Sequence, residues 1–208
     1  MKRVENKYVI NDANEFNKFL KFIFKNSFRE IYKKRKINSI YFDYDNLKLY
    51  DLSEEGVASK DKVRLRYYGE EYDIKNTNLE IKNSNAYSKN KYVSNFLETE
   101  SNCDKKIIFA KNEIFSKKLK PKVKVSYNRR YFFSEEHGRL TIDENIIYEK
   151  VNFNNNYRKI NLSSKSIEKR RVCEHKIENQ TCSEYFIPIS NIRFSKYCEA
   201  IKRVFLNY

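Results

Sequence analysis

Lys62-Val63-Arg64-Leu65-Arg66-Tyr67-Tyr68 is the stretch from which the fold can be inferred. Its charged and apolar residues alternate strictly, and a period of two residues is typical of a β-strand. The alternation places Lys62, Arg64 and Arg66 on one face of the strand and Val63 and Leu65 on the other. An exposed sheet face can also carry such a row of cations, so this stretch alone does not indicate a binding site.

The same charged alternation returns in four other stretches of the chain. Because the opposite faces are apolar enough to pack helices, we expect the sheet to close with its charged face inward. Such a lumen suits a polyanion, since Arg and Lys bind phosphate oxygens and carboxylates bind a metal that bridges those oxygens. The polar positions are Arg3, Glu5 and Lys7, then Glu80 and Lys82, then Arg139, Thr141 and Asp143, and finally Glu174 and Lys176.

Apolar residues at helical spacing predict helices around this sheet. Asp12 and Glu15 form a capping-box pattern ahead of a stripe that runs from Phe16 to Phe24. A second helix is predicted over residues 104–119, ended by Pro121, and a third at the end of the chain after Ser195. Residues 47–52 are expected to form a turn or a short helical segment. Residues 152–156 and 163–166 are expected to be polar connections.

Length and charge restrict the class of protein. The 208 residues suit one domain, and no Pro-, Gly- or Ser-rich linker divides them, so a single domain is expected over residues 1–208. The formal net charge of +15 indicates an acidic partner, which could be polyphosphate, a nucleotide, nucleic acid or an anionic membrane. The basic run at residues 33–36 lacks interleaved stacking aromatics, so nucleic acid is not the main interpretation.

The cysteines and the apolar segments indicate a compartment. Cys103, Cys173, Cys182 and Cys198 show no CxxC pair and no metal-finger spacing, which favours reduced thiols in the cytoplasm. No apolar run reaches the length needed to span a membrane, and no apolar signal segment follows the charged start of the chain. We therefore expect a cytoplasmic protein with no transmembrane segment.

Eight short motifs resemble those of one family. The chain is similar to the catalytic domain of VTC-type polyphosphate polymerases, in the triphosphate tunnel metalloenzyme superfamily. The resemblance implies an α+β fold built on an eight-stranded antiparallel β-barrel tunnel with a charged lumen and peripheral helices. The motifs, in family order, are RVENKY (3–8), NSIYFD (38–43), KVRLRYY (62–68), LEIK (79–82), SYNR (126–129), RLTID (139–143), CEHK (173–176) and FSKY (194–197).

The resemblance also implies an activity. A polyphosphate polymerase transfers the γ-phosphate of ATP to a growing polyphosphate chain, and it needs a divalent metal, Mn²⁺ or Mg²⁺, but no protein nucleophile. The expected partners are ATP and inorganic polyphosphate, and peripheral association with a membrane protein is compatible with the family. Two alternatives stay open: a triphosphatase that hydrolyses ATP or tripolyphosphate, and a non-catalytic module that binds polyphosphate or nucleic acid.

The family pattern assigns roles to individual residues. The catalytic contacts to the reacting phosphates are expected from Arg64, Arg66, Lys82, Arg139 and Lys196. Binding of the triphosphate or polyphosphate is expected from Lys7, Lys62, Lys89, Lys91, Lys124, Arg129, Lys176 and Ser195. The expected metal ligands are Glu174 and Glu5.

Four of these assignments have competing interpretations. Strand parity puts Lys124 and Arg129 on opposite faces, so a bulge near Asn128 would be needed for both to face the lumen. The register of Lys89 and Lys91 is uncertain because an Asn- and Ser-rich loop precedes them. Glu174 could be half of an ion pair with Lys176 rather than a metal ligand. Ser195 could cap an ordinary terminal helix rather than face an anion.

Overall fold

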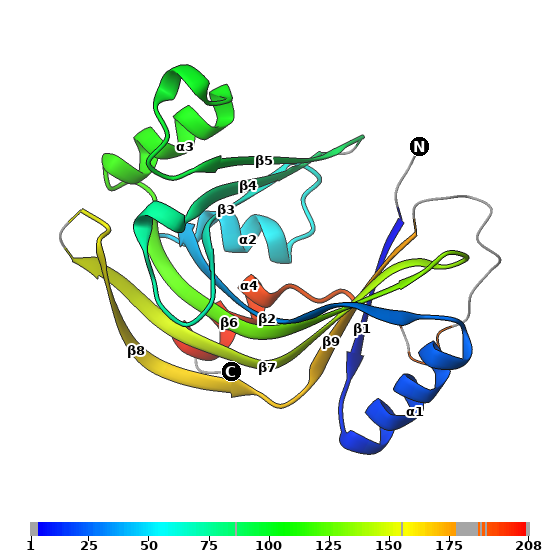
Figure 1. Ribbon diagram of the computed structural model, residues 1–208. Helices are drawn as coiled ribbons and strands as arrows, with labels where there is room; N and C mark the ends of the chain where they lie inside the picture. Colours follow the sequence, from blue (N-terminus) through cyan, green and yellow to red (C-terminus); the bar gives the residue numbers. More distant parts are fainter. Residues whose placement is uncertain are drawn as a thin grey trace. The chain divides into compact units, whose positions relative to one another are not determined.

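The computed structural model describes residues 4–85, 87–154, 156–177, 187, 189 and 191–206 (Figure 1). Arg3 and Cys182 therefore lie outside the described residues. The chain forms two compact units. Unit 1 comprises Met1–Lys36, Tyr127–Ile146 and Ile167–Ser195, and unit 2 comprises Ile37–Ser126, Ile147–Ser166 and Lys196–Tyr208.

The strands confirm the antiparallel sheet. Eight of them follow one hydrogen-bonded order, β1-β9-β7-β6-β2-β3-β4-β5, and β8 pairs with β7 off this path. The closure of the path into a tunnel stays a prediction. The strands are β1 (Val4–Ile10), β2 (Arg29–Asp43), β3 (Lys60–Tyr68), β4 (Asn78–Ser84), β5 (Lys89–Asn95), β6 (Lys120–Ser134), β7 (Gly138–Asn154), β8 (Lys159–Glu168) and β9 (Arg171–Ile177).

Four α-helices accompany the sheet in the described parts of the chain, which confirms the α+β class. They are α1 (Ala13–Lys25), α2 (Lys48–Glu54), α3 (Lys105–Phe115) and α4 (Lys196–Phe205), with 3-10 turns η1 (Ile74–Asn76) and η2 (Glu100–Asn102). None of the helices in the described residues is long and apolar enough to cross a bilayer.

The helix ends show where sequence patterns succeed and fail. The Asp12 side chain caps α1 by accepting from the Glu15 amide, as the capping pattern predicts. The second helix ends four residues earlier than expected, at Phe115, because Lys117 adopts a left-handed φ of 60°. Residues 152–154 and 163–166 also differ from expectation, since they lie inside β7 and β8 rather than in connections.

Unit 1 buries the apolar side of its strands under α1. Tyr8, Leu140, Ile142 and Cys173 point to this side, where the α1 residues Phe16, Phe19 and Ile23 pack on them. Most charged residues of these strands have the other parity and therefore lie on the opposite face. They are Glu5, Lys7, Arg139, Asp143, Glu174 and Lys176. Packing of the apolar face against α1 thus places these charged residues on the face away from the helix.

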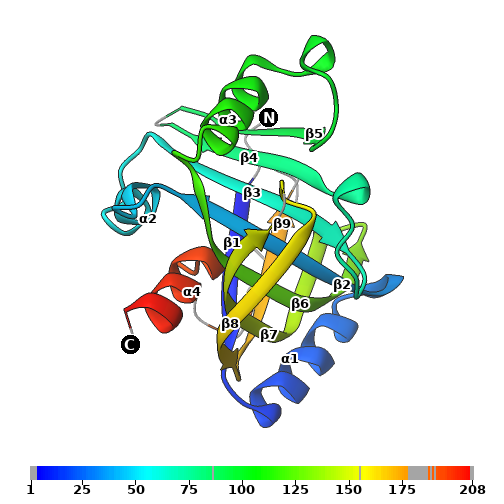
Figure 2. The same cartoon turned by 90° about the vertical axis from the view of Figure 1, so that its left-hand side faces the viewer.

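Unit 2 has its own core on the apolar side of β2 to β5. Val63 and Leu65 of β3 pack there with Leu79 and Ile81 of β4 and with Ile107, Ala110 and Ile114 of α3. Figure 2 shows β3, β4 and β5 side by side next to α3. Because the helix covers the apolar face, Lys62, Arg64 and Arg66 lie on the face that it leaves open, as the alternation predicts. The single domain expected over residues 1–208 stays a prediction.

Candidate functional site

The polar face of unit 2 brings lysines together across three strands. Lys62 of β3 lies directly opposite Lys82 of β4, and Lys82 lies opposite Lys91 of β5. Residues directly opposite in an antiparallel pair project from the same face with Cβ atoms about 4.5–5.5 Å apart. Lys89 shares this parity and pairs with Ser84, which resolves the register that the sequence left uncertain. We call Lys62, Arg64, Arg66, Lys82, Lys89 and Lys91 the cation face.

A buried carboxylate holds the two arginines of the cation face. Arg64 donates to Glu80 Oε2 from Nε at 2.8 Å and from Nη2 at 2.5 Å, and Arg66 Nη1 lies 3.6 Å from the same oxygen. Lys91 Nζ donates to Glu80 Oε1 at 2.8 Å. Arg66 also donates from Nε and Nη2 to Ser39 Oγ, each at 3.1 Å. Both arginine residues are only 8% exposed, so these contacts hold largely buried side chains in position.

These charges shift two pKa values. Burial alone would raise the pKa of Glu80, but the charges of Arg64 and Arg66 and the contact with Lys91 lower it to about 2. Tyr41 lies beside Arg64, whose Nη1 donates to the phenol oxygen at 3.0 Å. Burial would raise the pKa of Tyr41, yet the charges of Arg64 and Arg66 and this hydrogen bond lower it to about 8. Both shifts report a strongly positive environment on the cation face.

Helix α4 is fixed to unit 2 by its second residue. The Tyr197 ring stacks on Tyr41 with centroids 5.1 Å apart, and its hydroxyl donates to Asp43. Asp43 is fully buried and also accepts from the amides of Tyr44, Leu49 and Tyr50 at 2.7 to 2.9 Å. Lys196, the first residue of α4, is buried next to this anchor. Ser195, the last residue of unit 1, directly precedes α4 in the sequence. Its roles as helix cap and as ligand stay predictions.

The polar face of unit 1 carries two mixed rows. In one row Lys7 of β1 pairs with Glu174 of β9, which pairs with Thr141 of β7. In the next row Glu5 of β1 pairs with Lys176 of β9, which pairs with Arg139 of β7. Lys7 Nζ lies 3.8 Å from both Glu5 Oε1 and Glu174 Oε1, and it donates to the Phe194 carbonyl at 3.1 Å. Gly138 starts β7 so close to β9 that a Cβ there would lie 2.6 Å from the Lys176 carbonyl oxygen.

Arg129 joins this face without a bulge. Its guanidinium lies over the Tyr127 ring, 5.3 Å from the centroid, as regular alternation between residues 127 and 129 requires. It donates from Nε and Nη2 to the two oxygens of buried Asp143 at 2.6 and 2.7 Å, and Nη2 lies 3.5 Å from Glu174 Oε2. Burial would lower the pKa of Arg129, but the charge of Asp143 raises it well above its ordinary value. We call Glu5, Lys7, Arg129, Arg139, Thr141, Asp143, Glu174 and Lys176 the Glu174 face.

Lys124 has a different environment from Arg129. Its Nζ lies 3.3 Å from Glu149 Oε2 in unit 2. Glu149 shares strand parity with Val151 and Phe153, which pack in the core of unit 2. Lys124 therefore lies on the core side of its strand, whereas the cation face has the other parity. Its expected role in substrate binding stays a prediction.

Glu174 is the carboxylate of this face that could hold a divalent ion together with phosphate oxygens. No group of three or more His, Cys, Asp or Glu side chains in the described residues is arranged to hold a metal by itself. The distances from Glu174 to Lys7 and Arg129, 3.8 and 3.5 Å, exceed the 2.7–2.9 Å or so of a charge-assisted hydrogen bond. Mg²⁺ is commonly bound by one or two carboxylates together with substrate phosphates and water. Glu5 is exposed and would be the second carboxylate.

Several carboxylates and phenols with partners in this region could not be identified from the sequence. Glu80 has the same strand parity as Lys82, so the sequence predicts that it lies on the cation face. The sequence does not predict its ion pair with Arg64. The parity of Asp143 placed it on the charged face, but its pairing with Arg129 had no local signal. Asp43, Tyr41 and Tyr197 had none beyond membership in the quoted motifs. Each binds a residue that is not a local neighbour in sequence: pairing of strands brings Asp143 to Arg129, and packing of α4 on unit 2 brings Tyr197 to Asp43.

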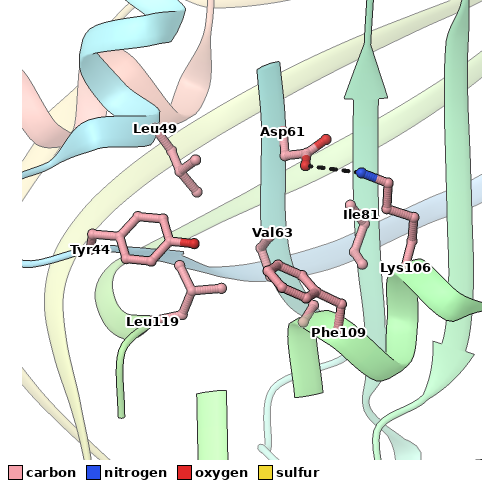
Figure 3. A pocket seen from close by; sticks show the side chains of 9 residues that line it. Tyr44, Leu49, Asp61, Val63, Ile81, Lys106, Phe109 and Leu119 are labelled. Atoms are coloured by element: carbon pink, nitrogen blue, oxygen red, sulfur yellow. Dashed lines mark ion pairs between the residues drawn. The ribbon is translucent and has the colours of Figure 1, made fainter. Parts of the chain in front are cut away.

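A small pocket lies on the other side of unit 2 (Figure 3). Its lining is mostly apolar, and an ion pair between Asp61 Oδ2 and Lys106 Nζ, 3.7 Å apart, lies among these residues. Val63 and Ile81 line it from the core face of β3 and β4. The pocket is therefore separate from the cation face.

Comparisons with known proteins agree with the motif pattern. The family model for the VTC domain matches residues 2–205. No curated protein sequence matches the chain.

Three solved structures show a distant likeness in fold. A candidate adenylate cyclase from Vibrio parahaemolyticus is 13% identical, covers 86% of this chain and 76% of its own, and has a TM-score of 0.44. The PH1819 protein of Pyrococcus horikoshii is 13% identical, with coverages of 85% and 80% and a TM-score of 0.42. The PH1012 protein of the same organism is 8% identical, with coverages of 85% and 80% and a TM-score of 0.38.

Proposed function

The chain belongs to the VTC domain family, and on that premise we propose that it is a polyphosphate polymerase, which transfers the γ-phosphate of ATP to a growing polyphosphate chain. The observation that carries the proposal is the row Lys62, Lys82 and Lys91. Like charges placed directly opposite in a sheet are destabilising. Lys91 already pairs with Glu80, and a chain of phosphates would add further negative charge along this row and beside Arg64 and Arg66.

The chemistry requires alignment and charge neutralisation more than a protein nucleophile. Arg64 and Arg66 are held by Glu80 and Ser39, so their outer N–H groups are fixed in position before a phosphate binds. Lys62, Lys82 and Lys91 supply point charges that follow successive phosphates. On the Glu174 face, Lys7, Arg129, Arg139 and Lys176 bind phosphate oxygens in the same way.

Glu174 would hold the divalent ion, Mn²⁺ or Mg²⁺, with Glu5 as a second carboxylate. The ion would neutralise charge on the phosphate oxygens when bound. Lys7 and Arg129 keep Glu174 ionised, because opposite charges this close favour the carboxylate form. We further propose that the reaction takes place in the cytoplasm, as the cysteine pattern indicates, and that the enzyme associates with a membrane protein only peripherally.

The test is incubation of the purified chain with ATP and Mn²⁺, followed by separation of polyphosphate from free phosphate. A polymerase produces long polyphosphate, and Lys82→Ala should reduce it. Lys118→Ala is the matched control, because this lysine is 67% exposed and pairs with Glu113 at the surface. Free phosphate alone would identify a triphosphatase, and bound ATP without turnover would identify a binding module; either result contradicts the proposal.

A further inference from the structure

Thr141 occupies the centre of the Glu174 face. It lies on β7 between Arg139 and Asp143, which project from the same face two residues away on either side. Across the ladder it is directly opposite Glu174, whose other neighbour is Lys7. Its same-face neighbours on β7 and β9, which are Arg139, Asp143 and Glu174, therefore all carry a charge.

The hydroxyl of Thr141 is the unusual feature of this environment. Its Oγ1 atom is buried and has no hydrogen-bond partner among the residues that the structure describes. Most buried side-chain polar atoms in proteins have a partner, and an exception needs an explanation. By contrast, the buried Thr77 donates from its Oγ1 to the Asp73 carbonyl at 2.6 Å. A hydroxyl without a partner inside a charged face indicates that the partner arrives with a ligand.

The surrounding charges indicate the chemistry of this ligand. The Glu174 face has four cations and three carboxylates, so its formal net charge is +1 and an anion is favoured there over a cation. A threonine hydroxyl donates one hydrogen bond, and an anionic oxygen is its best acceptor. We propose that Thr141 Oγ1 donates a hydrogen bond to a non-bridging phosphate oxygen bound on the Glu174 face. This inference rests on the proposed function and adds a neutral donor to its set of cationic ligands.

Thr141→Val tests the inference, because valine keeps the shape and the β-branch but has no hydroxyl. If Thr141 Oγ1 has no partner in the empty protein, the variant should melt at the same temperature as the wild type or higher. Its affinity for tripolyphosphate by calorimetry should fall about tenfold, as expected for one lost hydrogen bond to a charged group. Thr141→Ser keeps the hydroxyl and should restore most of the affinity.

Thr77→Val is the matched control. It removes a threonine hydroxyl that has a partner within the protein, so it should lower the melting temperature and leave tripolyphosphate affinity unchanged. Measurements with and without Mn²⁺ separate a phosphate contact from a contact to metal-bound water. The affinity loss in Thr141→Val should persist in a metal chelator, and a loss that appears only with Mn²⁺ would contradict the phosphate contact.

Two further outcomes overturn the inference and spare the proposed function. One is a wild type that binds tripolyphosphate and a Thr141→Val variant that binds it equally well. The other is a clear fall in the melting temperature of the empty Thr141→Val protein, which would show that the hydroxyl has a structural partner. If the wild type itself does not bind tripolyphosphate, the proposed function fails first.

Discussion

Tyr197 donates its hydroxyl hydrogen to Asp43, 154 residues earlier in the chain, and this contact fixes the start of α4 within unit 2. Burial and the negative charge of Asp43 raise the pKa of Tyr197, so the phenol keeps the proton that it donates. Three backbone amides complete the ligands of the Asp43 carboxylate. A fully buried carboxylate needs all of these donors, because an ion without partners is costly to bury.

Tyr197→Phe should therefore destabilise the protein. The ring would still stack on Tyr41, but Asp43 would lose its only side-chain donor among the contacts described here. A hydrogen bond to a charged group contributes about 1.5–3 kcal/mol, so we expect the free energy of unfolding to fall by about that amount. Urea denaturation measures it. An unchanged midpoint would show that the contact does not hold α4.

Arg66→Ala should weaken triphosphate binding and leave the fold nearly intact. Glu80 keeps Arg64 and Lys91 as partners, and removing one cation relieves repulsion on the cation face. The loss of one charge-assisted contact should cost about 1.5–3 kcal/mol of binding free energy. Calorimetry with ATP measures it, with Lys118→Ala as the charge-matched control. Equal affinity in Arg66→Ala and wild type would remove Arg66 from the site.

Glu80 should make stability depend on pH in the acid range. Its pKa is about 2 in the folded protein and ordinarily 4.5, so folding favours the carboxylate form. The stabilisation is complete above about pH 4.5 and is lost as the pH falls towards 2, because the folded state must then take up a proton against its preference. In Glu80→Gln this contribution is absent. The difference in unfolding free energy between the two proteins should shrink over that range, whereas a constant difference would contradict the assignment.

Tyr41 should ionise in a range unusual for a phenol. Its pKa is about 8, because Arg64 and Arg66 favour the phenolate despite burial. An ultraviolet titration should show one phenol ionising near that pH, and Tyr41→Phe should remove it. Tripolyphosphate should raise this pKa, since an anion on the cation face offsets the two arginines. A titration that tripolyphosphate leaves unchanged would place the anion elsewhere.

The strand faces were predictable from sequence because a strand has an exact period of two. Lys62, Arg64 and Arg66 could be placed on one face without any tertiary information, and the same holds for Glu174 and Lys176. The Asp12 cap was predictable for a similar reason, since its acceptor and donor are three residues apart. Local spacing decides both features.

The partners of these residues were not predictable, because they depend on register between distant segments. Glu80 pairs with Arg64 across a connection whose geometry the sequence does not give. Arg129, expected only as a phosphate ligand, also binds Asp143. The sequence favoured Lys176 as the ion-pair partner of Glu174, whereas the register adds Lys7 and the contact distances add Arg129. Where several charges lie near one side chain, tertiary packing determines which of them becomes its partner. A single sequence does not contain that information.

Glu174→Gln separates metal binding from ion pairing. If Glu174 holds a divalent ion, the variant should lose Mn²⁺-dependent turnover and keep its nucleotide affinity or gain some, because one negative charge has left a site for an anion. If Glu174 only pairs with Lys7 and Arg129, those cations lose a partner, the melting temperature should fall, and turnover should fall only with it. Glu30→Gln is the control, since it removes the carboxylate of the Arg130 ion pair on the outside of unit 1. Melting temperature, ATP affinity and turnover measured on both variants decide the question, and full turnover in a stable Glu174→Gln protein would remove Glu174 as the metal ligand.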